Sequence, residues 1–194
     1  MSRLIYESII TTLSEDGGVH IAPMGVWQED KLIVLAPFRP STTLDNLVRS
    51  GHVAVNASDD VRVFAGCLTG RRDWPTRPAT RIDCCVLADA LAHVEYRVER
   101  ISDDPVRPHF YCREVHRETH APFPGFNRAQ AAVIEAAILV SRLHRLPLAK
   151  IEREIDYLNI AVDKTAGSRE REAWAWLMEK IAAFRAERNK LETP

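Results

Sequence analysis

The strongest constraint on the fold is a change in hydrophobic periodicity at Ala121–Phe126, a segment that contains two prolines and one glycine. Before this segment, short runs alternate apolar and polar residues, which is typical of strands with one buried face. After it, apolar residues recur every three or four positions, as in amphipathic helices. The sequence therefore predicts an α+β protein, mainly β, with a sheet domain at residues 1–120 and a helical domain at residues 121–194 packed on it.

The first part of the chain predicts a small β-barrel. Residues 4–13 alternate in polarity, and Glu15–Gly18 is a strong hairpin signal. Residues 19–28 return as a second strand and Lys31–Ala36 form a third, while residues 92–99 and 108–115 read as a later hairpin. Six or seven strands with two short helices are enough to close a barrel of up-and-down or Greek-key type.

The second predicted strand is interrupted by Pro23 and Gly25. Because proline cannot donate to a strand ladder, we expect the strand to be bulged or edge-like at Pro23–Gly25. A backbone interrupted in this way indicates either the close approach of a ligand or a sharp bend of the barrel.

A short helix is predicted between the third and fourth strands, within Pro37–Gly51. Ser41, Thr42 and Thr43 are residue types that cap helix starts, with Asp45 suggesting a capping box, and Gly51 suits the left-handed position after a helix. Hydroxyls, first-turn N–H groups and the upstream Arg39 are also the components of a phosphate-binding site. The sequence leaves both interpretations open, a plain cap or a phosphate site.

A second spacing suggests a metal site. Cys112, His116 and His120 recur every four residues, which on a helix would place a thiol and two imidazoles on one side. The stretch reads better as a strand, in which residues four apart lie about 13 Å from each other. We therefore expect no metal site here.

The segment after residue 126 predicts three helices. Asn127 is a helix cap, residues 129–143 are nearly all apolar, and Leu146-Pro147 ends this first helix. Apolar stripes then define two further helices; the residues are Leu148, Ile151, Ile155, Leu158 and Val162, followed by Trp174, Leu177, Ile181 and Phe184. Three amphipathic helices with short links form a small bundle.

Composition and charge exclude several classes of protein. The 194 residues are 46% hydrophobic with a formal net charge of −1, which gives no general attraction to nucleic acid or to anionic membranes. No apolar run approaches the roughly 20 residues that span a bilayer, and Glu7 interrupts the place of a secretory signal. Four cysteines without a CxxC pair favour reduced thiols. We expect a cytoplasmic protein with no nucleic-acid or membrane partner.

Taken together, the motifs resemble those of the FMN-binding split-barrel flavoproteins. They comprise two hairpins, the Ser41-Thr-Thr43 helix, the strand His52–Asn56 with Asp60 after it, and Phe126-Asn-Arg-Ala129 at the start of the C-terminal region. Within these proteins, the chain is similar to a small archaeal and bacterial branch classed as a domain of unknown function, which has a helical C-terminal region. The resemblance extends over most of the chain.

The resemblance implies a split barrel followed by a three-helix region, a homodimer, and FMN at the subunit interface against the second strand. It implies that Ile21, Ala22, Pro23 and Met24 line the isoalloxazine, that Arg39, Ser41, Thr42 and Thr43 meet the phosphate, and that Arg128 is a second cation for it. The pyridoxamine-phosphate oxidases of this superfamily carry basic residues on the second and third strands, whereas Val19–Ala36 has only Lys31. A substrate cannot be transferred from that branch.

Bound FMN implies an oxidoreductase that acts on a small molecule. No acid–base pair stands out in the sequence; His20 is the best candidate, and a structural role for it is the alternative. Two other hypotheses stay open, a flavin-binding or interaction protein without turnover, and a split barrel that binds deazaflavin or haem.

Overall fold

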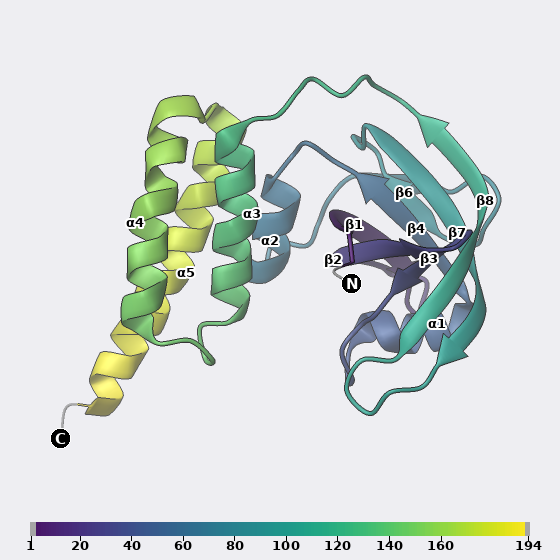
Figure 1. Cartoon of the computed structure of the whole chain (residues 1–194), viewed down its shortest axis with the longest axis horizontal. Helices are drawn as coiled ribbons and strands as arrows, with labels where there is room; N and C mark the ends of the chain where they lie inside the picture. Colours follow the sequence, from purple (N-terminus) through teal and green to yellow (C-terminus); the bar gives the residue numbers. More distant parts are fainter. Residues whose placement is uncertain (1–2, 193–194) are drawn as a thin grey trace. The chain divides into compact units, whose positions relative to one another are not determined.

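The structure is a computed structural model that describes residues 3–192 (Figure 1). It consists of two compact units. The first unit runs up to Ser58 and resumes at Asp73–Phe123, and the second comprises Asp59–Arg72 and the described residues from Pro124 onward.

The first unit is built on a closed antiparallel barrel of six strands, in the order β1-β2-β3-β8-β7-β4. The barrel strands are β1 (Ile5–Leu13), β2 (Val19–Glu29), β3 (Leu32–Leu35), β4 (His52–Ala57), β7 (Ala92–Ser102) and β8 (His109–Thr119). A two-stranded ribbon of β5 (Thr76–Pro78) and β6 (Cys85–Leu87) completes the strands. The short helix α1 (Thr42–Ser50) connects β3 to β4, as the sequence predicted.

The bulge expected in the second strand is absent. The register between β1 and β2 is continuous from Ile5↔Trp27 to Leu13↔Val19, with Pro23 opposite Ile9. The other expectation, an edge-like strand, is correct, because β3 pairs only with Val26–Glu29 of β2. Among the described residues, the part of β2 from residue 19 to residue 25 therefore pairs with β1 alone, and proline is tolerated in such an edge-like strand.

Helix α1 contributes to the core of the barrel. Leu44 and Leu47, one turn apart, are buried together with barrel residues; these include Ile10, Val26, Leu35, Val53, Tyr96, Phe110 and Cys112. Gly51 follows the helix with φ +66°, the left-handed conformation predicted for it. This packing fixes where the N-terminus of α1 lies relative to β1 and β2.

The second unit is a helical bundle with one more helix than we expected. Helices α3 (Arg128–Ser141), α4 (Leu148–Thr165) and α5 (Ser168–Glu192) agree with the three predicted helices (Figure 1). The additional helix, α2 (Arg62–Thr69), is the second of the two short helices that the sequence predicted before residue 121, but it belongs to this unit and not to the barrel. Ala65 and the preceding Val61 are buried in one cluster with α3 and α5, which is why residues 59–72 group with the helical unit although they precede the boundary at 120/121.

The apolar stripes expected from the sequence form the core of the bundle. The buried residues of this core include Val133, Ala136, Val140, Ile151, Val162, Trp174, Leu177 and Ile181. The predicted cap is also present, since the Asn127 side chain accepts from the N–H groups of Ala129 and Gln130. Among the described residues, no helix combines the length and the hydropathy needed to cross a bilayer.

Candidate functional site

The N-terminus of α1 is the first candidate site. Ser41 is the N-cap, and its hydroxyl accepts the N–H of Leu44 at 3.3 Å. The capping box that we expected from Thr42 and Asp45 is therefore not the arrangement here. Helix geometry leaves the N–H groups of Thr42 and Thr43 without an intrahelical acceptor, and the positive end of the helix dipole lies at the same place.

The two threonines have different surroundings. Thr42 is exposed, whereas Thr43 is buried and its hydroxyl lies 3.1 Å from Nε2 of His20 on β2. This contact places an imidazole of the second strand beside the first turn of α1. The structure therefore brings together His20 and the threonine-rich helix start, which the sequence could only propose separately.

Arg39 lies two residues before the N-cap, on an exposed stretch. Its Nη2 donates to Oδ1 of Asp103 at 3.1 Å, and the two side chains are 49% and 87% exposed. An exposed ion pair of this kind contributes about 0–1 kcal/mol. The guanidinium can therefore exchange its partner for an anionic ligand at little cost.

The four residues predicted to line a flavin lie on the one-sided part of β2. Ile21 is buried, while Ala22, Pro23 and Met24 are half-buried. They pair in register with Thr11, Ile10, Ile9 and Ser8 of β1. Because this stretch pairs with β1 alone within residues 3–192, its other edge can be approached by a ligand or by another chain.

Arg128 is the first residue of α3 and is exposed. It belongs to the helical unit, whereas α1 belongs to the barrel unit. It lines a groove of about 270 Å³ between α3 and α4, together with Glu135, Tyr157, Leu158 and others.

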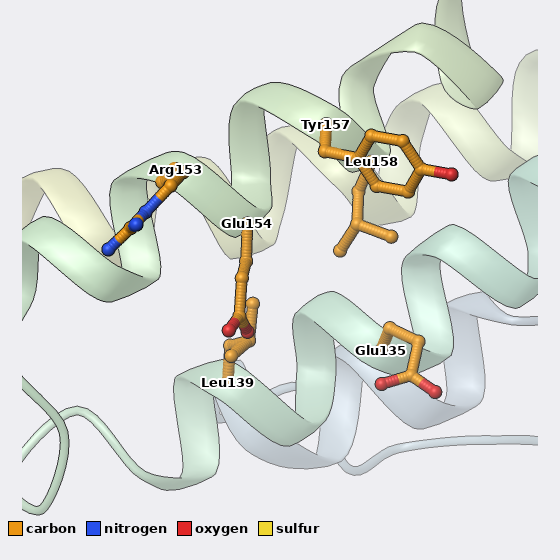
Figure 2. Close-up of a pocket in the computed structure, with 6 residues that line it drawn as sticks. All are labelled: Glu135, Leu139, Arg153, Glu154, Tyr157 and Leu158. Carbon is orange, nitrogen blue, oxygen red and sulfur yellow. The ribbon is translucent and has the colours of Figure 1, made fainter.

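A neighbouring groove, of about 340 Å³, continues along the same two helices (Figure 2). Glu135 and Leu139 of α3 line one side, and Arg153, Glu154, Tyr157 and Leu158 of α4 line the other. Its lining mixes apolar side chains with both signs of charge, and it includes Leu158 from one of the apolar stripes that the sequence showed.

Buried amides fix the barrel strands behind the candidate site. The side chain of Asn56 on β4 donates to the carbonyl of Ile9 and to the Thr11 hydroxyl, and accepts the N–H of Leu87 at 2.9 Å. Asn46 of α1 donates to the Thr12 hydroxyl at 2.9 Å. These bonds tie α1, β1, β4 and β6 together.

A second cluster lies on β7 and β8, and the sequence did not predict it. His93 and Glu95 of β7 face His116 and Glu118 of β8, and His120 follows on the same side. The Cys112 of the proposed metal spacing is not part of this cluster, because it is buried in the barrel core. The spacing of residues along β8 could not show that His93 belongs to this cluster, since His93 lies on β7 and meets Glu118 and His120 only through the pairing of the two strands.

Glu95 is fully buried and is held as a carboxylate. It accepts the N–H groups of Thr80, Arg81 and Ile82 at 2.6, 2.6 and 3.1 Å. Burial alone would raise the pKa of Glu95. The hydrogen bonds from Thr80, Arg81 and His93 and the charge of His116 lower it by more than burial raises it, so the pKa lies below its ordinary value. A charged carboxylate is therefore present in the interior.

His93 is also buried, and it links Glu95 to His120. Its Nε2 lies 3.3 Å from Glu95 Oε1, and its Nδ1 lies 2.9 Å from His120 Nε2. Burial lowers the pKa of His93, and the hydrogen bond to Glu95 opposes this shift without reversing it. The ring is therefore neutral at pH 7, with one protonated nitrogen and one lone pair.

Comparison with known protein families matches both parts of the chain. A model described as "Protein of unknown function (DUF447) N-terminal domain" matches residues 6–121, and one described as "Protein of unknown function (DUF447)" matches residues 127–179. Comparison with curated proteins gives no match.

Solved structures share the fold. An FMN-bound DUF447 protein from Methanosarcina mazei has a TM-score of 0.81 at 20% identity, over 92% of this chain and 96% of that chain. The 2-nitrobenzoate 2-nitroreductase NbaA from Pseudomonas fluorescens has a TM-score of 0.52 at 22% identity, over 62% of this chain and 66% of that chain. Nitrilotriacetate monooxygenase component B from Mycobacterium thermoresistibile has a TM-score of 0.51 at 19% identity, over 61% of this chain and 71% of that chain. The expected α+β split-barrel fold is confirmed.

Proposed function

Because the chain belongs to the DUF447 family of proteins of unknown function, over residues 6–121 and 127–179, we propose that it is an FMN-binding flavoprotein. The observation that carries the proposal is the FMN-bound DUF447 protein that shares the fold over 92% of this chain. The N-terminus of α1 supports it, since the local geometry suits a phosphate.

The residues at this helix start fit a phosphate group. The N–H groups of Thr42 and Thr43 and the exposed Thr42 hydroxyl are donors at the positive end of the helix dipole. Arg39 adds a cation whose present partner, Asp103, is exposed. The Thr43 hydroxyl instead positions His20, so we assign it to the support of the site and not to direct phosphate contact.

FMN would supply hydride or electron transfer, and we propose an oxidoreductase that acts on a small molecule. The chain's own contribution would be to bind and orient the isoalloxazine along Ile21–Met24 of β2. His20, hydrogen-bonded to Thr43, would hold a proton at Nε2 or Nδ1 beside this strand.

We also propose a homodimer. Leu4, Ile5 and Tyr6 are 71%, 51% and 60% exposed at the start of β1, and residues 19–25 of the adjacent β2 have an open edge. Exposed apolar side chains beside an open strand edge favour association with another chain. Light scattering of the eluting protein should give twice the mass of the 22.0 kDa chain. A Leu4→Glu, Tyr6→Glu variant should elute as a monomer, and a monomeric parent protein would reject the dimer.

The cofactor site is tested by comparing two ligands that differ in the phosphate. FMN and riboflavin share the isoalloxazine, so loss of a phosphate contact should weaken FMN alone. We expect Arg39→Gln and Thr42→Val each to raise the Kd for FMN about fivefold or more, as for a lost charged hydrogen bond, with the Kd for riboflavin unchanged. Flavin fluorescence quenching gives both constants.

Arg113→Gln is the matched control, because it also removes an exposed positive charge, one that pairs with Glu99 on the barrel surface. It should leave both constants unchanged. Equal losses of FMN and riboflavin, or an equal effect of Arg113→Gln, would contradict a phosphate site at α1.

A further inference from the structure

The cluster on β7 and β8 has the composition of a transition-metal site. Three histidines and two glutamates converge; the residues are His93, Glu95, His116, Glu118 and His120. Imidazole together with carboxylate suits zinc-like divalent ions, whereas calcium and magnesium prefer oxygen ligands alone. The cluster lies entirely within the barrel unit.

We propose that His93, Glu118 and His120 bind one zinc-class divalent metal ion, with Glu95 as the group that orients His93. One ligand atom from each of the three residues lies within 4.8 Å of the others. The His93 Nδ1 and His120 Nε2 atoms are 2.9 Å apart. Two nitrogens bound to the same ion at the usual 2.0–2.1 Å lie roughly 3 Å apart, so these atoms are already close to a chelating separation.

The tautomer of His93 is set by the buried carboxylate behind it. Glu95 accepts three backbone N–H groups, and its Oε1 lies 3.3 Å from Nε2 of His93, so the ring nitrogen that faces this acceptor carries the hydrogen. The lone pair of His93 therefore lies on Nδ1, on the side of His120. A carboxylate that holds the second nitrogen of a histidine is the usual outer shell of a metal-binding imidazole.

His116 supplies an independent indication that a ligand is missing from this cluster. Its Nε2 is buried, has no hydrogen-bond partner within the described residues, and lies 3.8 Å from Oε2 of Glu118. A buried polar atom without a partner is unfavourable, and such atoms frequently mark an ion or a water. An ion drawn to Glu118 would lie within reach of this nitrogen.

Charge and access also favour a cation. Glu95 and Glu118 are the acidic groups of the cluster, and Arg77, which contacts His120 through Nη2, is the basic group beside them. Arg77 is only half-buried and can turn towards solvent when an ion binds. The side chains of His120 and Glu118 are 20% and 46% exposed, which gives the ion a route to the buried His93.

The test is titration of tag-free, EDTA-treated full-length protein with Zn²⁺, followed by calorimetry, and with Co²⁺, followed by visible absorption. We expect one ion per chain and visible d–d bands for Co²⁺. His120→Gln and Glu118→Gln should each weaken Zn²⁺ binding at least tenfold. Both side chains are partly exposed, so these variants should fold, whereas the buried His93 is left unchanged.

His144→Gln is the control, because His144 is an exposed histidine of the helical unit that contacts Phe184 and lies outside the cluster. It should bind Zn²⁺ as the unmodified protein does. Absence of saturable binding at one ion per chain would overturn the proposal and leave the cluster as an internal hydrogen-bonded network. Equal affinities of His120→Gln, Glu118→Gln and the parent protein would overturn it as well.

Discussion

At the scale of single residues, Asn56 has the most demanding position in the barrel. It is fully buried, and its amide bonds to Ile9 and Thr11 of β1 and to Leu87 of β6. A buried amide in this position does not gain from burial itself; it stabilises the protein because each of its polar atoms has a partner.

We predict that Asn56→Ala lowers the free energy of unfolding by about 2–3 kcal/mol, because it leaves the Ile9 carbonyl and the Leu87 N–H without partners in the interior. Urea denaturation followed by circular dichroism measures the change. Asn159→Ala on the exposed face of α4, where the amide bonds only to Asp163, is the control and should change stability by less than about 0.5 kcal/mol. Equal effects of the two variants would contradict this account.

The cysteines allow a prediction about pH. Burial raises the pKa of Cys67 and of Cys84 to about 11, and that of Cys112 to about 12. Burial also raises the pKa of Cys85, the one cysteine in the described residues that is not fully buried. Only the thiolate reacts with alkylating reagents, and a raised pKa keeps the thiol protonated at pH 8.

We expect the native protein at pH 8 to be alkylated slowly and first at Cys85, and all four thiols to react in urea. Raising the pH from 8 to 9 should increase the rate at Cys85 and leave the three buried thiols unmodified. Mass spectrometry of peptides after timed alkylation gives the order. Fast reaction of Cys112 in the native protein would show that the barrel core is more open than described.

At the scale of elements, helix α1 joins the candidate phosphate site to the barrel core. Its start holds Ser41 and the two threonines, its middle buries Leu44 and Leu47, and its end is turned by Gly51. A change at Gly51 tests how strongly the helix end determines stability without touching the candidate site.

We predict that Gly51→Ala destabilises the protein by about 1 kcal/mol, because a side chain at φ +66° is strained even though no atom lies within 4 Å of the added carbon. Gly51→Asn should cost less, since asparagine tolerates this conformation better. Thermal unfolding compares the variants. An alanine variant as stable as the parent would mean that the helix end relaxes freely.

The elements that the sequence predicted are those specified by local signals. Alternation defined β1 and β7, caps defined α1 and α3, and Gly51 marked a helix end. For β2 the sequence left two expectations, a bulge or an edge-like strand, and the structure has the edge-like strand. A proline such as Pro23 is compatible with both, so the sequence alone could not choose between them. The β7 and β8 cluster was missed because pairing between strands, and not spacing within one, brings His93 to His120.

At the scale of the whole molecule, the two units do not follow the order of the chain. Residues 59–72 leave the barrel to join the helical unit, and the chain then returns to the barrel at Asp73. The helical unit is therefore made from two segments that are separated in the sequence. The apolar residues of the first segment, which holds α2, are buried by α3 and α5 of the second.

We predict that a chain ending at Phe123 aggregates, because Val61 and Ala65 lose the α3 and α5 residues that bury them. A second truncation, in which residues 59–72 are also replaced by a short Gly/Ser linker, should stay soluble and monodisperse. Size-exclusion chromatography with a dye that binds apolar surface separates the two outcomes. Equal behaviour of both truncations would show that α2 does not depend on the helical unit.

The central claim, that this DUF447 chain binds FMN, is tested most directly by the absorbance spectrum of the freshly purified protein, taken again on the supernatant after heat denaturation. We predict flavin bands near roughly 370 and 450 nm, and FMN, identified by mass, in the supernatant. A colourless protein that also takes up no added FMN would contradict the claim, and α1 would then begin with a plain helix cap.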